Sequence, residues 1–547
     1  MNSQRINRIM LAAPGSGSGK TTVTCALLKV LKDRGMDVAG FKCGPDYIDP
    51  LFHKKILGVE SRNLDTFFAG EEGVRKILST CSAGVAVIEG VMGLYDGLSV
   101  SETKGSAYEI ADLTDTPIIL VVDASGIGRT VISLIKGMLL DDTKKLIRGV
   151  ILNRITESFY EKLKPVLEDE ITSLRDDVKL HGFLPKDPGI GIKSRHLGLM
   201  LPGEIDDIKQ RIEIASSLLE AHVDVNGLLT LMDNHVDADG QESMPEDKMD
   251  VDGSTSLTQE PEESDGRAML TEDMDPNKSE LAEQEAGSIV TSDTVCAISS
   301  GPELTLAVAY DEAFCFYYKE NLELFEKLGV KIRYFSPLHD KALFEEADGI
   351  LLGGGYPENH LERLSNNTGM RASIKEAIEN KIPSLAECGG FMYLHRTIAD
   401  REGREFEMAG VIDGACFFSG HLVRFGYLEV AAVNSSPETA LHILPETHVT
   451  QESDIGYNNK VEPDLLNSMV GLRGHEFHYY ESSKNGEALR VCKPDRSMER
   501  NCMVSESGGI WGFLHFYYPS APDFVKAFAG RMKEYKSMKE VQSGKQQ

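Results

Sequence analysis

Two short segments, far apart in this 547-residue chain, carry residue types that could do chemistry. Residues 13–22 are rich in glycine and end in the run Gly19, Lys20, Thr21, Thr22. Residues 386–390 place Cys388 between an acidic residue and two glycines. A loop of the first kind binds a nucleoside triphosphate, and a cysteine of the second kind can open an amide. Together they predict ATP-driven amide synthesis with nitrogen taken from glutamine.

The glycine-rich segment lies between a predicted strand, residues 8–13, and a predicted helix, residues 20–34. In that setting backbone N–H groups approach the phosphates, the Lys20 ammonium reaches the β and γ oxygens, and the Thr21 hydroxyl can bind Mg²⁺. Pro14 stands where the strict pattern has glycine, and one extra residue separates Ala13 from Gly19, a spacing that resembles the loop of dethiobiotin synthetases. The predicted nucleotide-binding residues of the loop are Gly15, Ser16, Gly17, Ser18, Gly19, Lys20, Thr21 and Thr22.

Acidic residues follow two further predicted strands, residues 38–41 and 85–88. Asp46 and Asp49 come after the first strand, and Glu89 comes directly after the second. The carboxyl ends of parallel strands meet at one edge of a sheet, so these acids are candidates for a magnesium shell and for the surroundings of a substrate carboxylate. We predict a metal site made by Thr21, Asp46 and Glu89. The alternative for Asp46 and Asp49 is that they form turns beside prolines.

A second α/β pattern begins near residue 304, with predicted strands at 304–310, 331–335 and 349–352 and a predicted helix at 315–328. A strand at 382–386 then leads to Cys388, and a helix is expected at 390–397.

A cysteine on such a tight turn is exposed, and the helix N-terminus is expected to lower its thiol pKa. Backbone N–H groups of Gly354, Gly355 and Gly389 would form the oxyanion hole for amide attack. The alternative is a buried structural cysteine.

With these motifs the chain resembles the cobyrinic acid a,c-diamide synthases. The likeness covers nearly the whole chain except a central acidic stretch, and it is carried by the glycine-rich loop and by residues 41–50, 63–65, 89–97, 153–154, 353–358, 387–390 and 474–479. The resemblance implies an ATP- and glutamine-dependent ligase that converts the a and c acetate side chains of a cobalt corrinoid into amides, with Mg²⁺ expected at the metal site above. It adds Asn153 to the nucleotide site and assigns the substrate to Lys42, Tyr47, Asp49 and Asp96.

The resemblance extends to class I glutamine amidotransferases, which carry a catalytic histidine on a strand near the C-terminus. His515 fits that position, so Cys388 and His515 are the predicted catalytic residues. Many class I members have glutamate two residues later, and the corrinoid ligases commonly have histidine, but this chain has Tyr517. The group that orients His515 is therefore open. His475 and His478 either line the glutaminase or the domain interface, or are core or capping histidines.

Alternating apolar strands and helices predict a doubly wound parallel sheet in residues 1–232 and a second α/β domain, the amidotransferase, in residues 300–540. Residues 233–293 between them contain 19 Asp and Glu against 3 Lys and Arg, and no aromatic residue. A segment of this composition cannot bury enough apolar surface to offset its ordering entropy. We therefore predict a disordered linker at 233–299, with an acidic docking segment as the alternative.

The net charge of −29 argues against binding to nucleic acid. No run of 18 apolar residues predicts a membrane span, and no secretory signal precedes the first strand. Nine scattered cysteines favour free thiols in a reducing compartment, so a cytoplasmic location is expected.

The expected binding partner is a small tetrapyrrole substrate. The sequence is also compatible with a homodimer. Two alternatives stay open: the same chemistry on hydrogenobyrinate or nickel-sirohydrochlorin, and a regulatory ATP-binding protein with a vestigial glutaminase.

Overall fold

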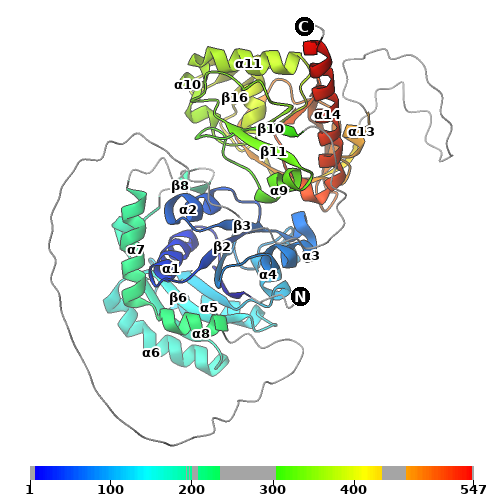
Figure 1. Cartoon of the computed structure of the whole chain (residues 1–547). Coiled ribbons are helices and arrows are strands. Elements are labelled where there is room, and N and C mark those ends of the chain that lie inside the picture. The colour runs from blue at the N-terminus through cyan, green and yellow to red at the C-terminus, as the bar shows by residue number, and fades with distance from the viewer. Residues whose placement is uncertain are drawn as a thin grey trace, which may run out of the picture. The chain divides into compact units, whose positions relative to one another are not determined.

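The computed structural model describes residues 6–192, 194–195, 198–199, 207–233, 303–433 and 463–544. The predicted acidic linker lies outside these residues, so its predicted disorder stays a prediction. Met1–His235 and Ala297–Gln547 belong to one compact unit, which holds both α/β regions (Figure 1).

A seven-stranded sheet forms the centre of the N-terminal region, and every neighbouring pair of its strands is parallel. In spatial order the strands are β3 (Ser61–Leu64), β2 (Val38–Cys43), β4 (Val85–Glu89), β1 (Asn7–Ala12), β5 (Ile118–Asp123), β6 (Ile147–Ile155) and β7 (Lys179–Pro185). β1 lies where the strand order reverses, because β2 and β5 are on its opposite sides. Ligands on such sheets bind beyond the carboxyl ends of the strands at this reversal.

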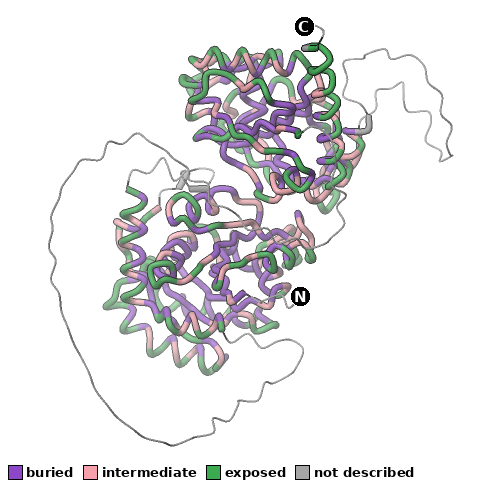
Figure 2. Tube along the Cα trace, viewed as in Figure 1, coloured by how far each residue is buried: buried purple, intermediate pink, exposed green. Residues whose placement is uncertain are grey.

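Helices cover both faces of this sheet. Within β1, Ile9 and Leu11 pack in one apolar core and Met10 and Ala12 in another, as expected for a strand with period two. The first core includes α1 (Lys20–Asp33), α2 (Ile48–Leu57), α7 (Ile208–His222) and α8 (Val225–Asp233). The second includes α3 (Thr66–Ser79), α4 (Ala107–Leu113), α5 (Thr130–Asp141) and α6 (Glu157–Leu174). The predicted doubly wound class is therefore confirmed, and Figure 2 shows the buried strands at its centre.

The C-terminal region is also α/β, as predicted. Its main sheet has the order β11 (Val330–Phe335), β10 (Leu304–Ala309), β12 (Gly349–Leu352), β13 (Ser384–Glu387), β23 (Gly509–Gly512) and β22 (Val504–Glu506), with only β22 antiparallel to its neighbour.

Two smaller sheets extend the region. One contains β15 (Glu405–Glu407), β14 (His395–Ala399), β16 (Ile412–Phe418) and β19 (Tyr480–Ser482), and the other contains β21 (Glu499–Cys502), β20 (Leu489–Cys492), β17 (Arg424–Val433), β18 (Arg473–His478) and β24 (His515–Tyr517). The helices are α9 (Lys319–Lys327), α10 (Leu361–Asn366), α11 (Thr368–Glu379), α12 (Gly389–Leu394), α13 (Pro463–Asn467) and α14 (Pro522–Gly544).

Two predicted helices of this region were wrong in extent. The helix expected at 315–328 begins only at Lys319, because the backbone N–H groups of Cys315 and Phe316 donate to the Gly354 carbonyl at 3.0 and 3.1 Å. The helix expected at 390–397 ends at Leu394, and the chain then enters β14. There His395 is buried, and its Nε2 lies 2.7 Å from the Ser482 hydroxyl. Tertiary pairing overrides helical periodicity at both places.

No helix of the described residues is both long enough and apolar enough to cross a membrane. The eight cysteines of the described residues are all free.

Candidate active sites

The glycine-rich loop joins β1 to α1 in the predicted way. Gly17 and Gly19 have φ of 76° and 87°, in the left-handed region that favours glycine. α1 begins at Lys20, whose Nζ donates to the Gly15 carbonyl at 3.1 Å and to the Met92 carbonyl at 2.5 Å. The lysine therefore lies back across its own loop. To reach a triphosphate, its ammonium must exchange these two carbonyls for phosphate oxygens.

Two residues of β6 hold the loop from the side. Asn153 Nδ2 donates to the Ser18 carbonyl at 2.8 Å, and a Cβ at Gly19 would collide with this amide. Arg154 Nη1 donates to the Gly17 carbonyl at 2.8 Å and pairs with Asp123 at 2.7 Å. Asn153 thus contacts the predicted nucleotide loop. Arg154 was not among the predicted site residues, although its place beside Asn153 at the carboxyl end of β6 was a signal.

A chain of buried polar contacts leads from the loop into the sheet edge. The Thr21 hydroxyl donates to Glu89 Oε1 at 2.6 Å, and Lys42 Nζ lies 3.0 Å from the same oxygen. Lys42 and Glu89 are register partners in the neighbouring strands β2 and β4. Lys42 also forms a short ion pair with Asp49 in the first turn of α2. The structure therefore brings Thr21, Glu89 and Asp49 together, as the strand-end argument predicts, and adds Lys42, which the family resemblance assigns to the substrate.

The charged groups in this cluster shift one another's pKa values. Burial opposes ionisation of Glu89, but the Lys42 charge, the nearby His53 ring and the hydrogen bond from Thr21 hold the pKa of Glu89 below its ordinary value. Burial, and then the charges of Asp46 and Glu89, raise the pKa of Asp49. Burial and the neighbouring Lys42 charge lower the pKa of Lys20 to about 8. A triphosphate bound at this loop would place negative charge beside the Lys20 ammonium and so favour its charged form.

The predicted metal residues are only partly brought together. Asp46 caps α2, because its Oδ1 accepts from the backbone N–H of Ile48 at 2.7 Å, in line with the turn-forming alternative. Glu89 Oε2 is buried without a hydrogen-bond partner. In the described residues no three His, Cys, Asp or Glu side chains form a metal-holding group. The oxygens of Thr21 and Glu89 nevertheless suit Mg²⁺, which uses one or two carboxylates and takes its other ligands from phosphates and water.

His53 is a further member of the cluster that the sequence reasoning missed. It is fully buried, and its Nε2 lies 3.5 Å from Glu89 Oε2 while its Nδ1 lies 2.9 Å from the Ser61 hydroxyl. The signal was its spacing, because His53 follows Asp49 by four residues on α2 and so shares its face.

The other two predicted substrate residues make different contacts. Asp96 is exposed and accepts from the Gly93 backbone N–H at 2.8 Å, which closes the turn after β4. The Tyr47 ring is buried among aromatic residues of the C-terminal region, where it stacks on Phe316 with centroids 5.1 Å apart and planes at 3°.

Cys388 occupies a strained turn between β13 and α12. Its φ of 47° and ψ of −104° are rare for a residue with a side chain. The backbone N–H of Cys388 donates to the Gly512 carbonyl at 2.8 Å, which fixes the turn to β23. A Cβ at Gly390 would collide with the Leu352 carbonyl, so the turn requires a small residue there. This geometry is that of a nucleophile held between a strand and a helix.

The expected lowering of the thiol pKa is wrong for this structure. Cys388 is buried, with 8% of its surface exposed, and burial followed by the nearby charge of Glu358 raises the pKa of its thiol. α12 has only six residues, so its N-terminus does not outweigh desolvation. The thiol is therefore neutral in this state, and deprotonation needs a base.

The predicted oxyanion loop lies beside the cysteine turn, because Leu352 and Ala386 are register partners in β12 and β13. A Cβ at Gly389 would lie 3.1 Å from the Gly355 nitrogen. A Cβ at Gly354 would collide with His515 Cε1. The structure thus brings the turn after Cys388 and the His515 ring to the same loop, 353–355.

His515 is buried on β24 and stacks on His475, its register partner on β18, with centroids 5.1 Å apart. Burial, and then the proximity of His475 and His478, lower the pKa of His515 well below its usual range. His515 Nδ1 has no hydrogen-bond partner among the described residues. Tyr517 does not orient this ring, because it stacks on Phe68 at 5.4 Å.

The two other candidate histidines, His475 and His478, have different surroundings. His478 stacks on Phe513 at 4.0 Å, and its Nδ1 lies 2.6 Å from the Tyr480 carbonyl, which makes it a core histidine. His475 lines the site, with its Nδ1 3.3 Å from the Tyr318 hydroxyl.

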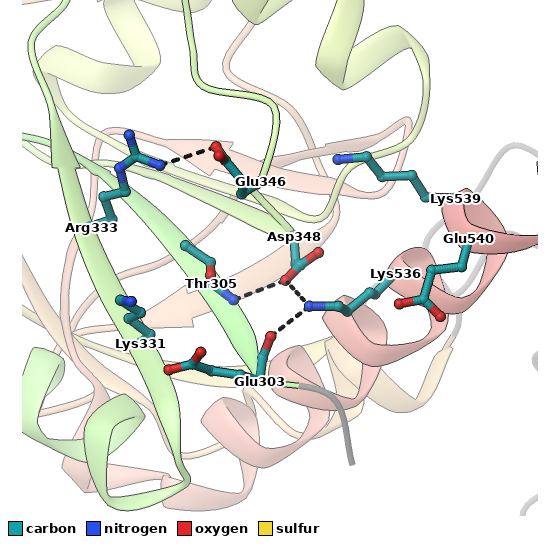
Figure 3. A pocket seen from close by; sticks show the side chains of 9 residues that line it. All are labelled: Glu303, Thr305, Lys331, Arg333, Glu346, Asp348, Lys536, Lys539 and Glu540. Carbon is teal, nitrogen blue, oxygen red and sulfur yellow. Dashed lines mark hydrogen bonds and ion pairs between the residues drawn. The ribbon is translucent and has the colours of Figure 1, made fainter. Parts of the chain in front are cut away.

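A cavity of about 540 Å³ lies elsewhere in the C-terminal region (Figure 3). It is lined by Glu303, Thr305, Lys331, Arg333, Glu346, Asp348, Lys536, Lys539 and Glu540. Thr305 and Lys331 are near the amino ends of β10 and β11, whereas Cys388 follows the carboxyl end of β13. Its charges balance and are largely paired, as with Lys536 and Asp348 at 3.3 Å. The cavity is therefore remote from the cysteine chemistry.

Family models match both regions. The model for the CobQ/CobB/MinD/ParA nucleotide binding domain matches residues 9–198, and that for the CobB/CobQ-like glutamine amidotransferase domain matches residues 305–520. Fold and site thus define a glutamine amidotransferase joined to a P-loop nucleotide-binding domain.

Whole-length relatives narrow this class. A protein of Clostridium tetani named cobyrinate a,c-diamide synthase is 36% identical, over 95% of this chain and 98% of its own. Proteins of that name from Caldanaerobacter subterraneus subsp. tengcongensis and Listeria innocua are 32% and 33% identical, each over 96% of this chain and over 98% and 99% of their own. The chain belongs to the cobyrinate a,c-diamide synthase family, which confirms the resemblance inferred from the motifs.

Proposed function

We propose that this protein uses ATP and glutamine to convert the a and c acetate carboxylates of cobyrinate into amides, a step in corrinoid (cobalamin) biosynthesis. The observation that carries the proposal is the pairing, in one chain, of a phosphate-binding loop beside a buried Glu89–Lys42 cluster with a strained cysteine turn beside a buried histidine. Its whole-length relatives bear the name of this activity.

In the synthetase half, residues 15–22 hold ATP, with Asn153 supporting the loop from the side. A substrate carboxylate attacks the γ-phosphorus, ADP leaves, and ammonia then displaces phosphate from the acyl phosphate. Thr21 and Glu89 would hold Mg²⁺, with Asp46 as the third predicted ligand. Bound there, Mg²⁺ would neutralise charge on the phosphate oxygens. Lys42, Asp49 and Asp96 are proposed to face the substrate.

In the glutaminase half, Cys388 attacks the side-chain amide of glutamine, and His515 takes the thiol proton and gives a proton to the departing ammonia. Water then hydrolyses the thioester to glutamate. The backbone N–H groups of Gly389, Gly354 and Gly355 are proposed to stabilise the oxyanion, since all three lie beside the cysteine turn or His515. A neutral His515 is the form that accepts the proton.

We further propose the division into a ligase domain at 1–232, a linker at 233–299 and an amidotransferase domain at 300–540. The tetrapyrrole is the proposed partner, a homodimer is the proposed assembly, and the cytoplasm is the proposed location.

The test is incubation of the protein with ATP, Mg²⁺, glutamine and a panel of tetrapyrrole carboxylates: cobyrinate, hydrogenobyrinate and nickel-sirohydrochlorin. Each amidation replaces OH by NH₂, so mass spectrometry reads a loss of about one mass unit per step. Two such losses on cobyrinate are expected. Turnover of another ring alone would reassign the substrate, and no turnover with any ring, together with no glutamine hydrolysis, would favour a regulatory protein.

A further inference from the structure

The structure leaves one part of the glutaminase unassigned: the group that holds His515. Tyr517 occupies the position where many class I amidotransferases have the orienting glutamate, and its ring stacks on Phe68. His515 Nδ1 has no hydrogen-bond partner among the described residues. The imidazole is instead held by ring contacts. One comes from His475 within the same sheet, a second comes from the nucleotide-binding region, and a more distant one comes from Phe316, with ring centroids 6.4 Å apart.

That second contact is Tyr47. Its ring centroid lies 5.2 Å from that of His515 and 5.8 Å from that of His475, with planes inclined at 48° and 35°. Tyr47 is the residue before α2, in the segment that follows β2. The Tyr318 hydroxyl donates to the carbonyl of Pro45, two residues before Tyr47, at 3.1 Å, which fixes this segment against the C-terminal region.

Tyr47 also touches the support of the oxyanion loop. Its ring stacks on Phe316, and the Phe316 backbone N–H donates to the Gly354 carbonyl. The His515 ring lies against Gly354 as well. One side chain of the nucleotide-binding region therefore packs against both the proposed base and the residue that supports the proposed oxyanion loop.

The backbone of Tyr47 connects to the other site. Asp49, two residues later, forms the buried ion pair with Lys42, and Lys42 pairs with Glu89, which accepts from Thr21 of the phosphate-binding loop. A shift of this segment on nucleotide binding would move the Tyr47 ring against His515.

We propose that Tyr47 is a positioning residue for glutamine hydrolysis, which holds the His515 imidazole in place of the missing carboxylate at position 517. The inference rests on the proposed function, because it takes Cys388 and His515 as the glutaminase pair. Tyr47 thereby acts on the nitrogen-releasing half, although the family resemblance assigns it to the substrate. Ring packing is the required property, so phenylalanine replaces it and an aliphatic residue does not.

The experiment compares Tyr47→Leu and Tyr47→Phe with wild type in the full-length protein. Two rates are measured: glutamine hydrolysis, and amide formation from ammonium chloride with ATP, Mg²⁺ and cobyrinate. Tyr47→Leu is expected to lower kcat for glutamine hydrolysis by about 10- to 100-fold, because a small misplacement of a catalytic group costs this much. The loss in its ammonium-dependent rate is expected to be much smaller, and Tyr47→Phe, which keeps the ring, is expected to hold glutamine hydrolysis within about threefold of wild type.

Tyr160→Leu is the matched control. Tyr160 is also a buried tyrosine of the nucleotide-binding region, stacked on Phe183 at 4.3 Å, and its loss should leave the ratio of the two rates unchanged. If Tyr47→Leu does not fold, Phe316→Leu tests the same ring contact from the other side, and a selective loss of glutamine hydrolysis is again expected.

Equal losses of both rates, or an unchanged glutaminase, would overturn the role of Tyr47. Cys388→Ala measured alongside separates this from failure of the proposed function. If Cys388→Ala still hydrolyses glutamine, the glutaminase assignment itself falls, whatever Tyr47 does.

Discussion

The two candidate sites of this protein differ in the charge of their buried side chains. Beside the phosphate-binding loop, charged side chains are buried and paired with one another, as Lys42 is with Glu89. Around Cys388, the buried groups are neutral: a thiol with a raised pKa and histidines with lowered ones, packed among aromatic rings. A site that holds a triphosphate needs fixed charge, whereas a site that passes protons needs groups that can change charge. Substitutions at the two sites should therefore affect different activities.

The sharpest separation comes from Cys388→Ala. This change should abolish amide formation from glutamine, by about 10³-fold or more, because no other group attacks the amide. Synthesis from ammonium chloride should continue near the wild-type rate, as read by mass spectrometry of the product. Cys81→Ala, at a partly exposed cysteine of the nucleotide-binding region, is the control and should keep both activities. Equal loss with both nitrogen donors would end the separation of the two sites.

Glu89→Gln should instead lower synthesis from both nitrogen donors by about 10²-fold. The change removes a negative charge from the proposed magnesium site and leaves Lys42 without this ion-pair partner. The measurement is the rate of amide formation across a Mg²⁺ titration. Glu170→Gln, in a surface ion pair of the same region, should leave the rate unchanged. A normal rate in Glu89→Gln at all Mg²⁺ concentrations would contradict the metal assignment.

A smaller effect tests the neutral histidines. Burial lowers the pKa of His475 to about 3, so below pH 6.5 the unfolded chain binds a proton that the folded chain does not. Stability should therefore fall as pH drops from about 6.5 toward 3, with a contribution from His475 of up to about 1.4 kcal/mol per pH unit.

The measurement is the free energy of unfolding in urea at pH 7, 6 and 5. His475→Gln should flatten this decline, while His421→Gln, at an exposed histidine, should follow wild type. A decline that is as steep in His475→Gln as in wild type would show that the His475 ring is not buried neutral.

The smallest effect is expected from deletion of residues 237–285. These residues carry no catalytic constellation, and loop-closure entropy changes slowly with length, so both half-reactions should stay within a few-fold of wild type. The two rates and the ammonia released per amide formed are the measurements. Ammonia that escapes to solvent after the deletion would mean that the segment takes part in coupling the two sites.

The sequence predicted the nucleotide-binding side better than the cysteine side. Thr21 belongs to the loop and helix after β1, and Glu89 ends β4; the carboxyl ends of parallel strands meet at one edge, so the proximity of these two residues follows from local pattern. Strand lengths were less predictable. β2 and β4 continue past their expected ends, because neighbouring strands pair beyond the apolar run.

On the cysteine side, the turn at Cys388 and the strand of His515 were predictable, but their surroundings were not. Tyr47, Phe316 and His475 reach His515 from three distant parts of the chain, and no local periodicity encodes their meeting. The sign of the Cys388 pKa shift was missed for the same reason. Burial is a property of the whole fold, and here it exceeds the effect of one short helix.

The buried, protonated thiol of Cys388 has a consequence for the lifetime of the enzyme. Peroxides and alkylating agents react with thiolates, and they reach exposed sulfur far faster than buried sulfur. With its pKa raised and only 8% of its surface exposed, the resting nucleophile is shielded from both. We expect slow labelling of Cys388 by iodoacetamide compared with the partly exposed Cys81. The strained turn that prepares the sulfur for glutamine would thus also keep it from oxidative damage between turnovers.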